Sequence, residues 1–213
     1  MSDKKDTWER LTAAKWAGSG IASTNDPSAK FQLLISGSGS NNKDEYRFDV
    51  SKMPTSLTPE SLLRSFALDP NGVVNSSEFN LINYFKKRAS ERIALGDIYD
   101  IDILGPDNGS IVIVAMSDGF GKTCRDSWFD IQTISCKKTG THPECGAREF
   151  GYNYTSDGGV SFYTRGVSRP STMMHRAGAS IQYRSWMSMM GGLRNKIKNL
   201  GGKADGSIAV SRS

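Results

Sequence analysis

Cys124 and two histidines are the residues whose types could support nucleophilic catalysis. A reactive cysteine needs a thiolate, which nearby positive charge stabilises, and Lys122 and Arg125 flank Cys124. Either His142 or His175 would act as the general base. The sequence therefore allows a Cys/His catalytic site, provided that the fold brings Cys124 within hydrogen-bond reach of one histidine.

A second group combines arginine, tyrosine and histidine side chains over residues 148–176. Guanidinium groups pair with phosphates and aromatic rings stack on bases, so this composition is typical of an anion-binding surface. The same groups could stabilise an oxyanion in an active site. Together with cations elsewhere in the chain, the predicted anion-binding residues are Lys122, Arg148, Tyr163, Arg165, Arg169, Arg176, Arg194, Lys196 and Lys198.

Two other patterns are incomplete. Residues 116–123, MSDGFGKT, follow a strand-like run as a phosphate-binding loop would, but Met116 stands where the first glycine belongs. The three cysteines and His142 could supply zinc ligands, yet the paired Cys-x2–4-Cys spacing of structural zinc sites is missing. We therefore predict no metal site and no cofactor.

The net charge of +5 is distributed unevenly. Residues 1–136 carry 15 Lys and Arg against 18 Asp and Glu, whereas residues 137–213 carry 12 against 4. Such segregated positive charge favours an anionic partner. The leading hypothesis is a binding protein that engages nucleic acid or an anionic membrane surface through its basic C-terminal third, as a structural, virion-type or membrane-active protein. The alternative is an exported effector or toxin-like enzyme, a hydrolase or transferase, that uses a Cys/His or Arg/Tyr/His site.

The elements that must position these residues follow from hydrophobic periodicity. Short turns between strand-like runs indicate an α+β fold, with an antiparallel meander of about five to seven strands covered by helices on one face. The expected helices span about residues 58–69, 76–95 and 180–200. The expected hairpins pair 30–35 with 46–50, 97–103 with 110–116, and 148–154 with 160–165, with a further strand at 128–134.

The length of 213 residues and a hydrophobic content of 37% suit one domain. We expect it to span residues 1–200, with a basic amphipathic helix at about 180–200 and a flexible tail at 201–213. No apolar run reaches the roughly 18 residues of a membrane-spanning helix. Because no secretory signal is recognisable, we expect a cytoplasmic protein, or one exported without a cleavable signal peptide.

The three cysteines are an odd number, which argues against a disulfide framework. A bridge between Cys136 and Cys145 stays open for a protein that reaches an oxidising compartment. The sequence leaves the oligomeric state undetermined.

Overall fold

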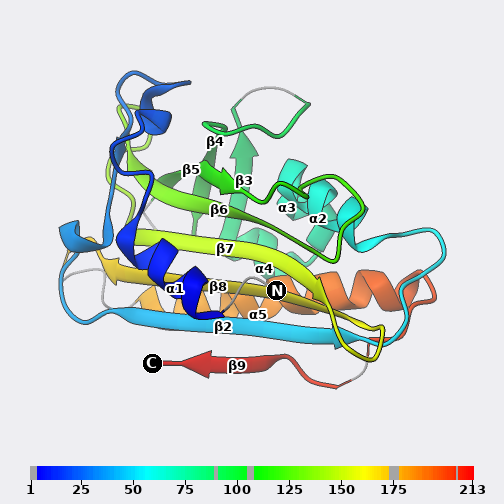
Figure 1. Cartoon of the computed structure of the whole chain (residues 1–213). Helices are drawn as coiled ribbons and strands as arrows, with labels where there is room; N and C mark the ends of the chain where they lie inside the picture. The colour runs from blue at the N-terminus through cyan, green and yellow to red at the C-terminus, as the bar shows by residue number, and fades with distance from the viewer. Residues whose placement is uncertain (1–3, 89–90, 105–107, 173–177, 205) are drawn as a thin grey trace.

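A computed structural model describes residues 4–88, 91–104, 108–172, 178–204 and 206–213 (Figure 1). The helices are α1 (Lys4–Ala13), α2 (Pro59–Leu68), α3 (Pro70–Val74), α4 (Ser77–Ile82) and α5 (Gly178–Asn199), with 3-10 turns η1 (Ile21–Ser23) and η2 (Leu34–Ser36). The strands are β1 (Lys30–Phe31), β2 (Asn42–Val50), β3 (Asn83–Lys87), β4 (Ile98–Ile103), β5 (Asn108–Met116), β6 (Asp126–Ser135), β7 (Glu144–Tyr154), β8 (Val160–Pro170) and β9 (Ala209–Arg212).

All strand pairs are antiparallel and join into one sheet in the order β3-β4-β5-β6-β7-β8-β2-β9, with β1 beside the end of β6. The consecutive run from β3 to β8 is the predicted meander, so the α+β class and the antiparallel sheet are confirmed. The sheet has nine strands, slightly more than the five to seven expected. Among the described residues, no helix is long and apolar enough to cross a membrane.

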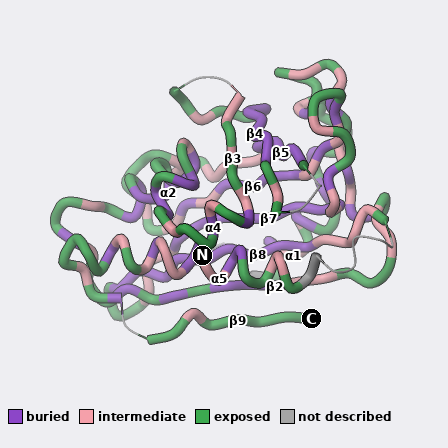
Figure 2. Tube along the Cα trace, turned by 180° about the vertical axis from the view of Figure 1, so that it is seen from behind, coloured by how far each residue is buried: buried purple, intermediate pink, exposed green. Residues whose placement is uncertain are grey.

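Two hydrophobic clusters lie on the two faces of the sheet. The larger one joins the sheet to α2, α3, α4 and α5, and the predicted covering helices therefore lie on this face. The smaller one lies under α1 and the segment that follows it, and Leu11, Trp16, Val112 and Ile134 belong to it. Figure 1 shows α1 in front of the sheet and α5 behind it, and buried residues line the strands between them in Figure 2.

The helix expected over residues 76–95 is wrong beyond Ile82. Ser76 caps α4 by accepting a hydrogen bond from the Phe79 amide, at 3.3 Å. The chain then turns extended as β3, because the Asn71 side chain accepts the Phe85 amide at 2.8 Å and donates to the Asn83 carbonyl at 2.8 Å. The apolar residues that suggested one helix are therefore divided between a helix and a strand.

The predicted hairpin between residues 30–35 and 46–50 is also wrong. β1 pairs with β6, whereas β2 pairs along its whole length with β8. Residues 209–212, which we expected in a flexible tail, form β9 on the other side of β2. These pairings join segments more than a hundred residues apart, which local turn signals cannot reveal.

The other expected elements form. α2 begins at a Thr58 capping box with proline at its first turn. The hairpins β4–β5 and β7–β8 have the predicted partners. α5 runs unbroken through Gly191 and Gly192. Gly192 packs closely against α3, since a Cβ there would lie 2.5 Å from the Val74 carbonyl oxygen.

Candidate functional site

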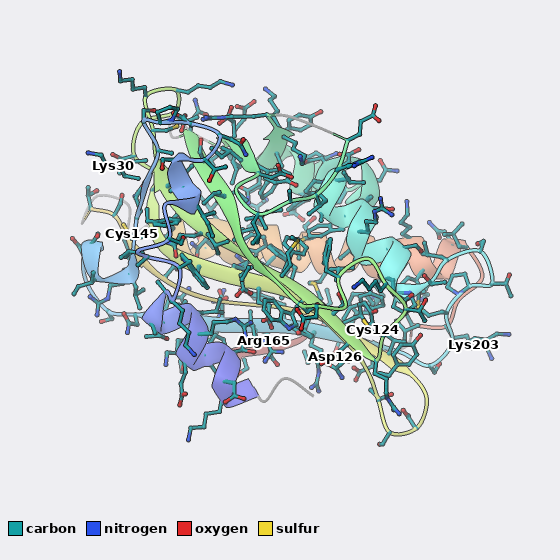
Figure 3. The ribbon with its side chains drawn as sticks, turned by 45° about the horizontal axis from the view of Figure 1, so that its top comes forward. Lys30, Cys124, Asp126, Cys145, Arg165 and Lys203 are labelled. Atoms are coloured by element: carbon teal, nitrogen blue, oxygen red, sulfur yellow. The ribbon has the colours of Figure 1, made fainter. Side chains whose placement is uncertain are left out.

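The structure does not bring Cys124 and His142 together. Cys124 lies in the turn before β6, and His142 lies beyond the other end of that ten-residue strand. At about 3.3 Å per residue, β6 separates them by roughly 30 Å. Figure 3 shows Cys124 and Asp126 at one end of the sheet, with Lys30 and Cys145 at the other. His175 lies outside the described residues.

Neither Cys124 nor His142 is arranged for catalysis. The Cys124 thiol donates to the Asp126 carbonyl, with an S–O distance of 2.8 Å. The His142 ring accepts the Glu144 amide at Nδ1, at 3.0 Å. All three cysteines are free thiols. Within the described ranges, no group of three His, Cys, Asp or Glu side chains could hold a metal ion.

Cys136 carries the more activated thiol. Burial raises its pKa, but hydrogen bonds from Thr139, Arg88 and Ser110 outweigh burial and lower the pKa to about 7. An Arg88 guanidinium nitrogen lies 3.1 Å from the sulfur. The side chain is buried, so this arrangement stabilises a thiolate in the structure without exposing it to substrates.

The predicted anion-binding residues do not converge on one surface. Side chains alternate across a strand, and Arg148 lies on the α5 face of the sheet whereas Tyr163 and Arg165 lie on the α1 face. Four cations of the basic third pair with carboxylates. These pairs are Arg148–Asp44, Arg165–Glu149 with Glu45 nearby, Arg184–Glu78 and Lys138–Asp100.

The remaining predicted cations are scattered. Arg169 donates to the side chain of Asn41, and Arg194 donates to the Gly206 carbonyl at 2.6 Å. Three exposed or half-exposed lysines lie on two elements: Lys122 in the β5–β6 connection, and Lys196 and Lys198 on α5. Arg176 lies outside the described residues.

A buried polar cluster lies between the sheet and α5. Arg148 forms an ion pair with Asp44 and donates to Thr164, at 3.3 Å. Its guanidinium also lies 4.2 Å from the ring centroid of Trp186 on α5. The charged pair is almost completely withdrawn from water, since Asp44 is 1% and Arg148 8% exposed. Such a pair is stable only because each charge has close partners.

Glu144 and Tyr46 complete this cluster. Burial, with the negative charge of Asp44 nearby, raises the pKa of Glu144 to about 7, although hydrogen bonds from Ser168 and Gln182 oppose the rise. The buried Tyr46 hydroxyl accepts a hydrogen bond from an Arg212 guanidinium nitrogen at 2.9 Å. Near neutral pH, Glu144 can therefore act as a hydrogen-bond donor or as an acceptor.

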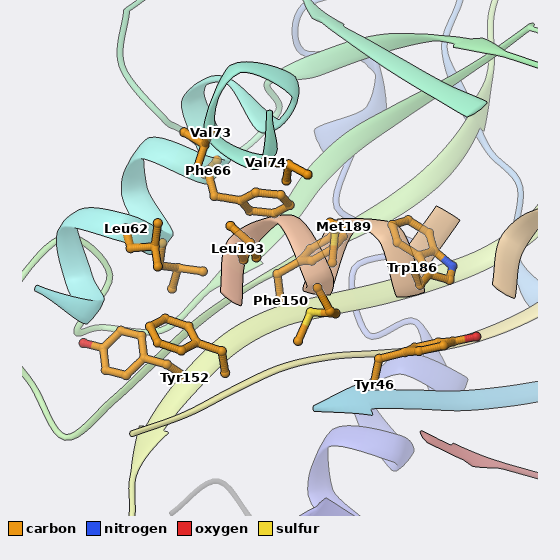
Figure 4. Close-up of a cluster of buried hydrophobic side chains, with 14 of the residues drawn as sticks. Tyr46, Leu62, Phe66, Val73, Val74, Phe150, Tyr152, Trp186, Met189 and Leu193 are labelled. Carbon is orange, nitrogen blue, oxygen red and sulfur yellow. The ribbon is translucent and has the colours of Figure 1, made fainter. Parts of the chain in front are cut away.

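An apolar layer adjoins the polar cluster. The Phe150 ring meets the Trp186 ring edge-on, with centroids 5.9 Å apart, and Figure 4 shows Phe150 between Trp186 and Tyr152. A void of about 20 Å³ opens beside Phe150, which is room for one water molecule. It is lined by Leu62, Leu63, Phe66, Phe150, Gly151, Phe162, Tyr163, Met189, Met190 and Leu193.

Two buried polar atoms of this layer have no hydrogen-bond partner among the described residues. They are the indole nitrogen of Trp186 and Oε1 of Glu60. The first lies beside the Arg148–Asp44 pair, and Glu60 lies by Tyr152 at the other end of the layer. A buried polar atom without a partner costs about 1–3 kcal/mol, and a bound water, ion or ligand can remove this cost.

The opposite face of the sheet holds a second charged network. Arg10 from α1 contacts Asp130 at 2.8 Å and also pairs with Glu149, and its guanidinium lies 3.9 Å from the Trp128 ring. Both carboxylates are fully buried. Burial raises the pKa of Asp130 to about 7 and also raises that of Glu149. The network attaches α1 to the sheet, because Arg10 comes from α1 and both carboxylates come from strands.

Sequence reasoning missed the partnership of Asp44 with Arg148, although a signal for it exists. Asp44 alternates in phase with Tyr46 and Phe48 on β2, and Arg148 alternates in phase with Phe150 on β7. Both charges therefore share the apolar side of their strands. A charged residue on the buried side of a strand needs a partner of opposite charge. β2 supplies the negative charge of Asp44 and β7 supplies the positive charge of Arg148.

No family model and no curated protein matches this chain. Among solved structures, a hypothetical protein from Helicobacter pylori has a TM-score of 0.50 at 5% identity, over 70% of this chain and 83% of that one. Ara h 8.0201 has a TM-score of 0.45 at 11% identity, over 73% of this chain and 99% of that one. The ginseng major latex-like protein 151 from Panax ginseng has a TM-score of 0.46 at 12% identity, over 75% of this chain and 99% of that one. These likenesses concern the fold and assign no ligand.

Proposed function

We propose that this chain is a binding protein that holds a small amphiphilic molecule between the sheet and α5. The observation that carries this proposal is the Trp186 indole N–H, which is buried and has no acceptor among the described residues, at the point where the apolar layer meets the Arg148–Asp44 pair. A ligand oxygen placed there would satisfy the donor. The ligand's apolar part would then extend past Phe150 toward the void.

The polar cluster suits a head group that accepts hydrogen bonds. Trp186 can only donate through its indole nitrogen, and Arg148 is a donor with a permanent positive charge. A protonated Glu144 adds a third donor, since its pKa is raised to about 7. A carboxylate, a sulfonate or a carbonyl group matches these donors better than an amine, which would bring a second cation toward Arg148.

The space for the apolar part of the ligand is not preformed. The void of about 20 Å³ is far below the roughly 300 Å³ of a preformed small-molecule site. Met189 and Met190 line it, however, and methionine side chains are unbranched and adapt readily to a new neighbour. Ligand entry would therefore repack these methionines against the sheet, and we expect a slender ligand to bind better than a bulky one.

The internal pairing of cations argues against a large anionic surface as the partner. Four of the twelve Lys and Arg residues of the basic third are matched by carboxylates, and the predicted anion-binding residues do not converge on one surface, which disfavours nucleic acid or an anionic membrane as the partner. The anionic group of the ligand would instead be small and would lie at Arg148. For the enzymatic alternative, the described residues supply no assembled Cys/His site.

The Trp186→Phe variant tests the proposal, because it keeps a ring over Arg148 but removes the unpartnered N–H. The probe is anilinonaphthalene sulfonate, which joins apolar rings to an anionic group, titrated into the full chain by fluorescence with dodecanoate as competitor. We expect saturable binding that weakens about fivefold in Trp186→Phe, the worth of one hydrogen bond. Thermal stability should be unchanged or slightly higher.

Trp8→Phe is the matched control, because Trp8 belongs to α1 and packs against the hydrophobic cluster on the other face of the sheet. It should leave probe affinity within twofold of the parent. If both substitutions weakened probe binding equally, or if dodecanoate did not reverse the increase in probe fluorescence, the probe would bind elsewhere and the proposed site would be refuted.

A further inference from the structure

A groove of about 590 Å³ runs between α5 and the α3–α4 segment, on the outer side of the helices. Its volume lies within the range of small-molecule sites. Residues from both walls line it, including Asn75 and Ser77 on one side and Asn195 and Asn199 on the other. It is separate from the buried layer beneath α5, because it shares no lining residue with the void there.

The groove exists because many of its lining residues are glycines and serines, whose small side chains leave the space between the helices open. Gly192 lets α5 approach α3 so closely that a Cβ there would meet the Val74 carbonyl oxygen at 2.5 Å. Next to it, the hydroxyls of Ser76 and Ser188 form a hydrogen bond of 2.6 Å across the two walls. Gly191 borders open space: a Cβ added to it would lie 3.9 Å from the nearest atom, Cδ1 of Ile208.

Lys196 is the single charged residue among the thirteen that line the groove. Within the described ranges, no carboxylate lies close enough to form an ion pair with it. Glu78, which follows the lining residue Ser77 in the chain, pairs with Arg184 at 2.9 Å. The groove therefore presents one unneutralised cation surrounded by amides and hydroxyls, and it contains no aromatic ring on which a base or a sugar could stack.

We propose that this groove is a second binding site, for a small polar molecule bearing a phosphate or carboxylate group. Lys196 would pair with the anionic group, and the side-chain amides of Asn195 and Asn199 would donate to the polar remainder. Bulky apolar or aromatic ligands lack partners here. An anion gains from Lys196 and meets no opposing carboxylate, whereas a cation would be repelled.

Amide spectra of the isotope-labelled full chain, titrated with glycerol phosphate and separately with glutarate, test this site. We expect saturable shifts at residues 75–77 and 188–199 with one probe or both. The tighter of the two probes identifies the preferred anionic group. Absence of saturable shifts in this groove with both probes would overturn the proposal.

Lys196→Gln should weaken binding at least fivefold, since it removes the charge but preserves a helix-compatible, polar side chain. Lys198→Gln is the matched control, because Lys198 is exposed on the same helix and does not line the groove. It should change affinity less than twofold. Equal losses in both variants would indicate diffuse attraction to α5 and would refute a site built on Lys196, while unchanged thermal unfolding confirms that both variants fold.

Discussion

At the scale of single residues, burial decides which charged side chains pair within the protein and which stay available to a ligand. The basic third of the chain looks like a surface for an anion, but Arg148 and Arg165 turn inward and meet carboxylates on neighbouring strands. Buried pairs of this kind contribute little net stability, yet removing one partner is costly, because the other charge stays buried. Arg148 is thus held in place beside the Trp186 ring. Lys196, by contrast, forms no ion pair with any carboxylate of the described residues.

The buried Asp130 makes stability depend on pH. Its pKa is raised from 3.8 to about 7, so the folded protein holds a proton that the unfolded chain releases. The stabilisation from this proton is complete below pH 4 and is lost as the pH rises toward 7. We expect the parent to lose more than about 1 kcal/mol relative to Asp130→Asn over this interval, as measured by urea unfolding at several pH values.

The substitution Asp102→Asn is the control for this pH dependence, because Asp102 is half-exposed in a surface pair with Lys86. The difference between this variant and the parent should change little between pH 4 and pH 7. A constant difference between the parent and Asp130→Asn would contradict the raised pKa.

At the scale of elements, α5 is the component on which both proposed sites depend. Its inner side carries Trp186, Met189 and Leu193 toward the sheet, and its outer side carries Asn195 and Lys196 into the groove. One helix thereby separates an apolar layer from a polar groove. Its amphipathic pattern is sufficient to predict the helix, but not which partner each side meets.

Leu193→Ala should enlarge the void beneath α5. Removing the side-chain carbons of a buried leucine costs about 2–4 kcal/mol, through lost burial and the cavity left behind. If the apolar layer receives the ligand, affinity for anilinonaphthalene sulfonate should rise at the same time. Chemical unfolding and fluorescence titration measure the two effects, and a loss of affinity without unfolding would argue against the apolar layer as the ligand's location.

At the scale of the whole molecule, the sheet is assembled by pairings between distant segments. β2 enters between β8 and β9, so residues near 45 meet residues near 165 and near 211. Such contacts must overcome the entropy of closing long loops before they stabilise the fold. The edge strand β9 is short and all four of its residues are exposed, so we expect it to be the least stable part of the sheet.

Deleting residues 209–213 should therefore leave the fold intact and lower the stability by about 1–2 kcal/mol. The Lys43 amide, which donates to the Ser213 carbonyl at 2.9 Å, should exchange its hydrogen faster. Val210→Thr keeps the backbone of β9 and should leave Lys43 protected. Global unfolding of the truncated chain would show that β9 is essential to the core, contrary to this expectation.

The amino-acid sequence by itself determined most of the local elements, because the strand-like runs of β4 to β8, the turns between them and the periodicity of α5 are properties of neighbouring residues. It did not determine where β1, β2 and β9 pair, nor the end of α4, since Asn71 ends that helix by contacts with the backbone of Asn83 and Phe85. The candidate sites were likewise decided by tertiary structure. Arg148, Arg165 and Lys196 are neutralised only if the fold brings carboxylates from distant segments beside them. A count of charges along the chain does not contain the distances between those charges in the folded protein.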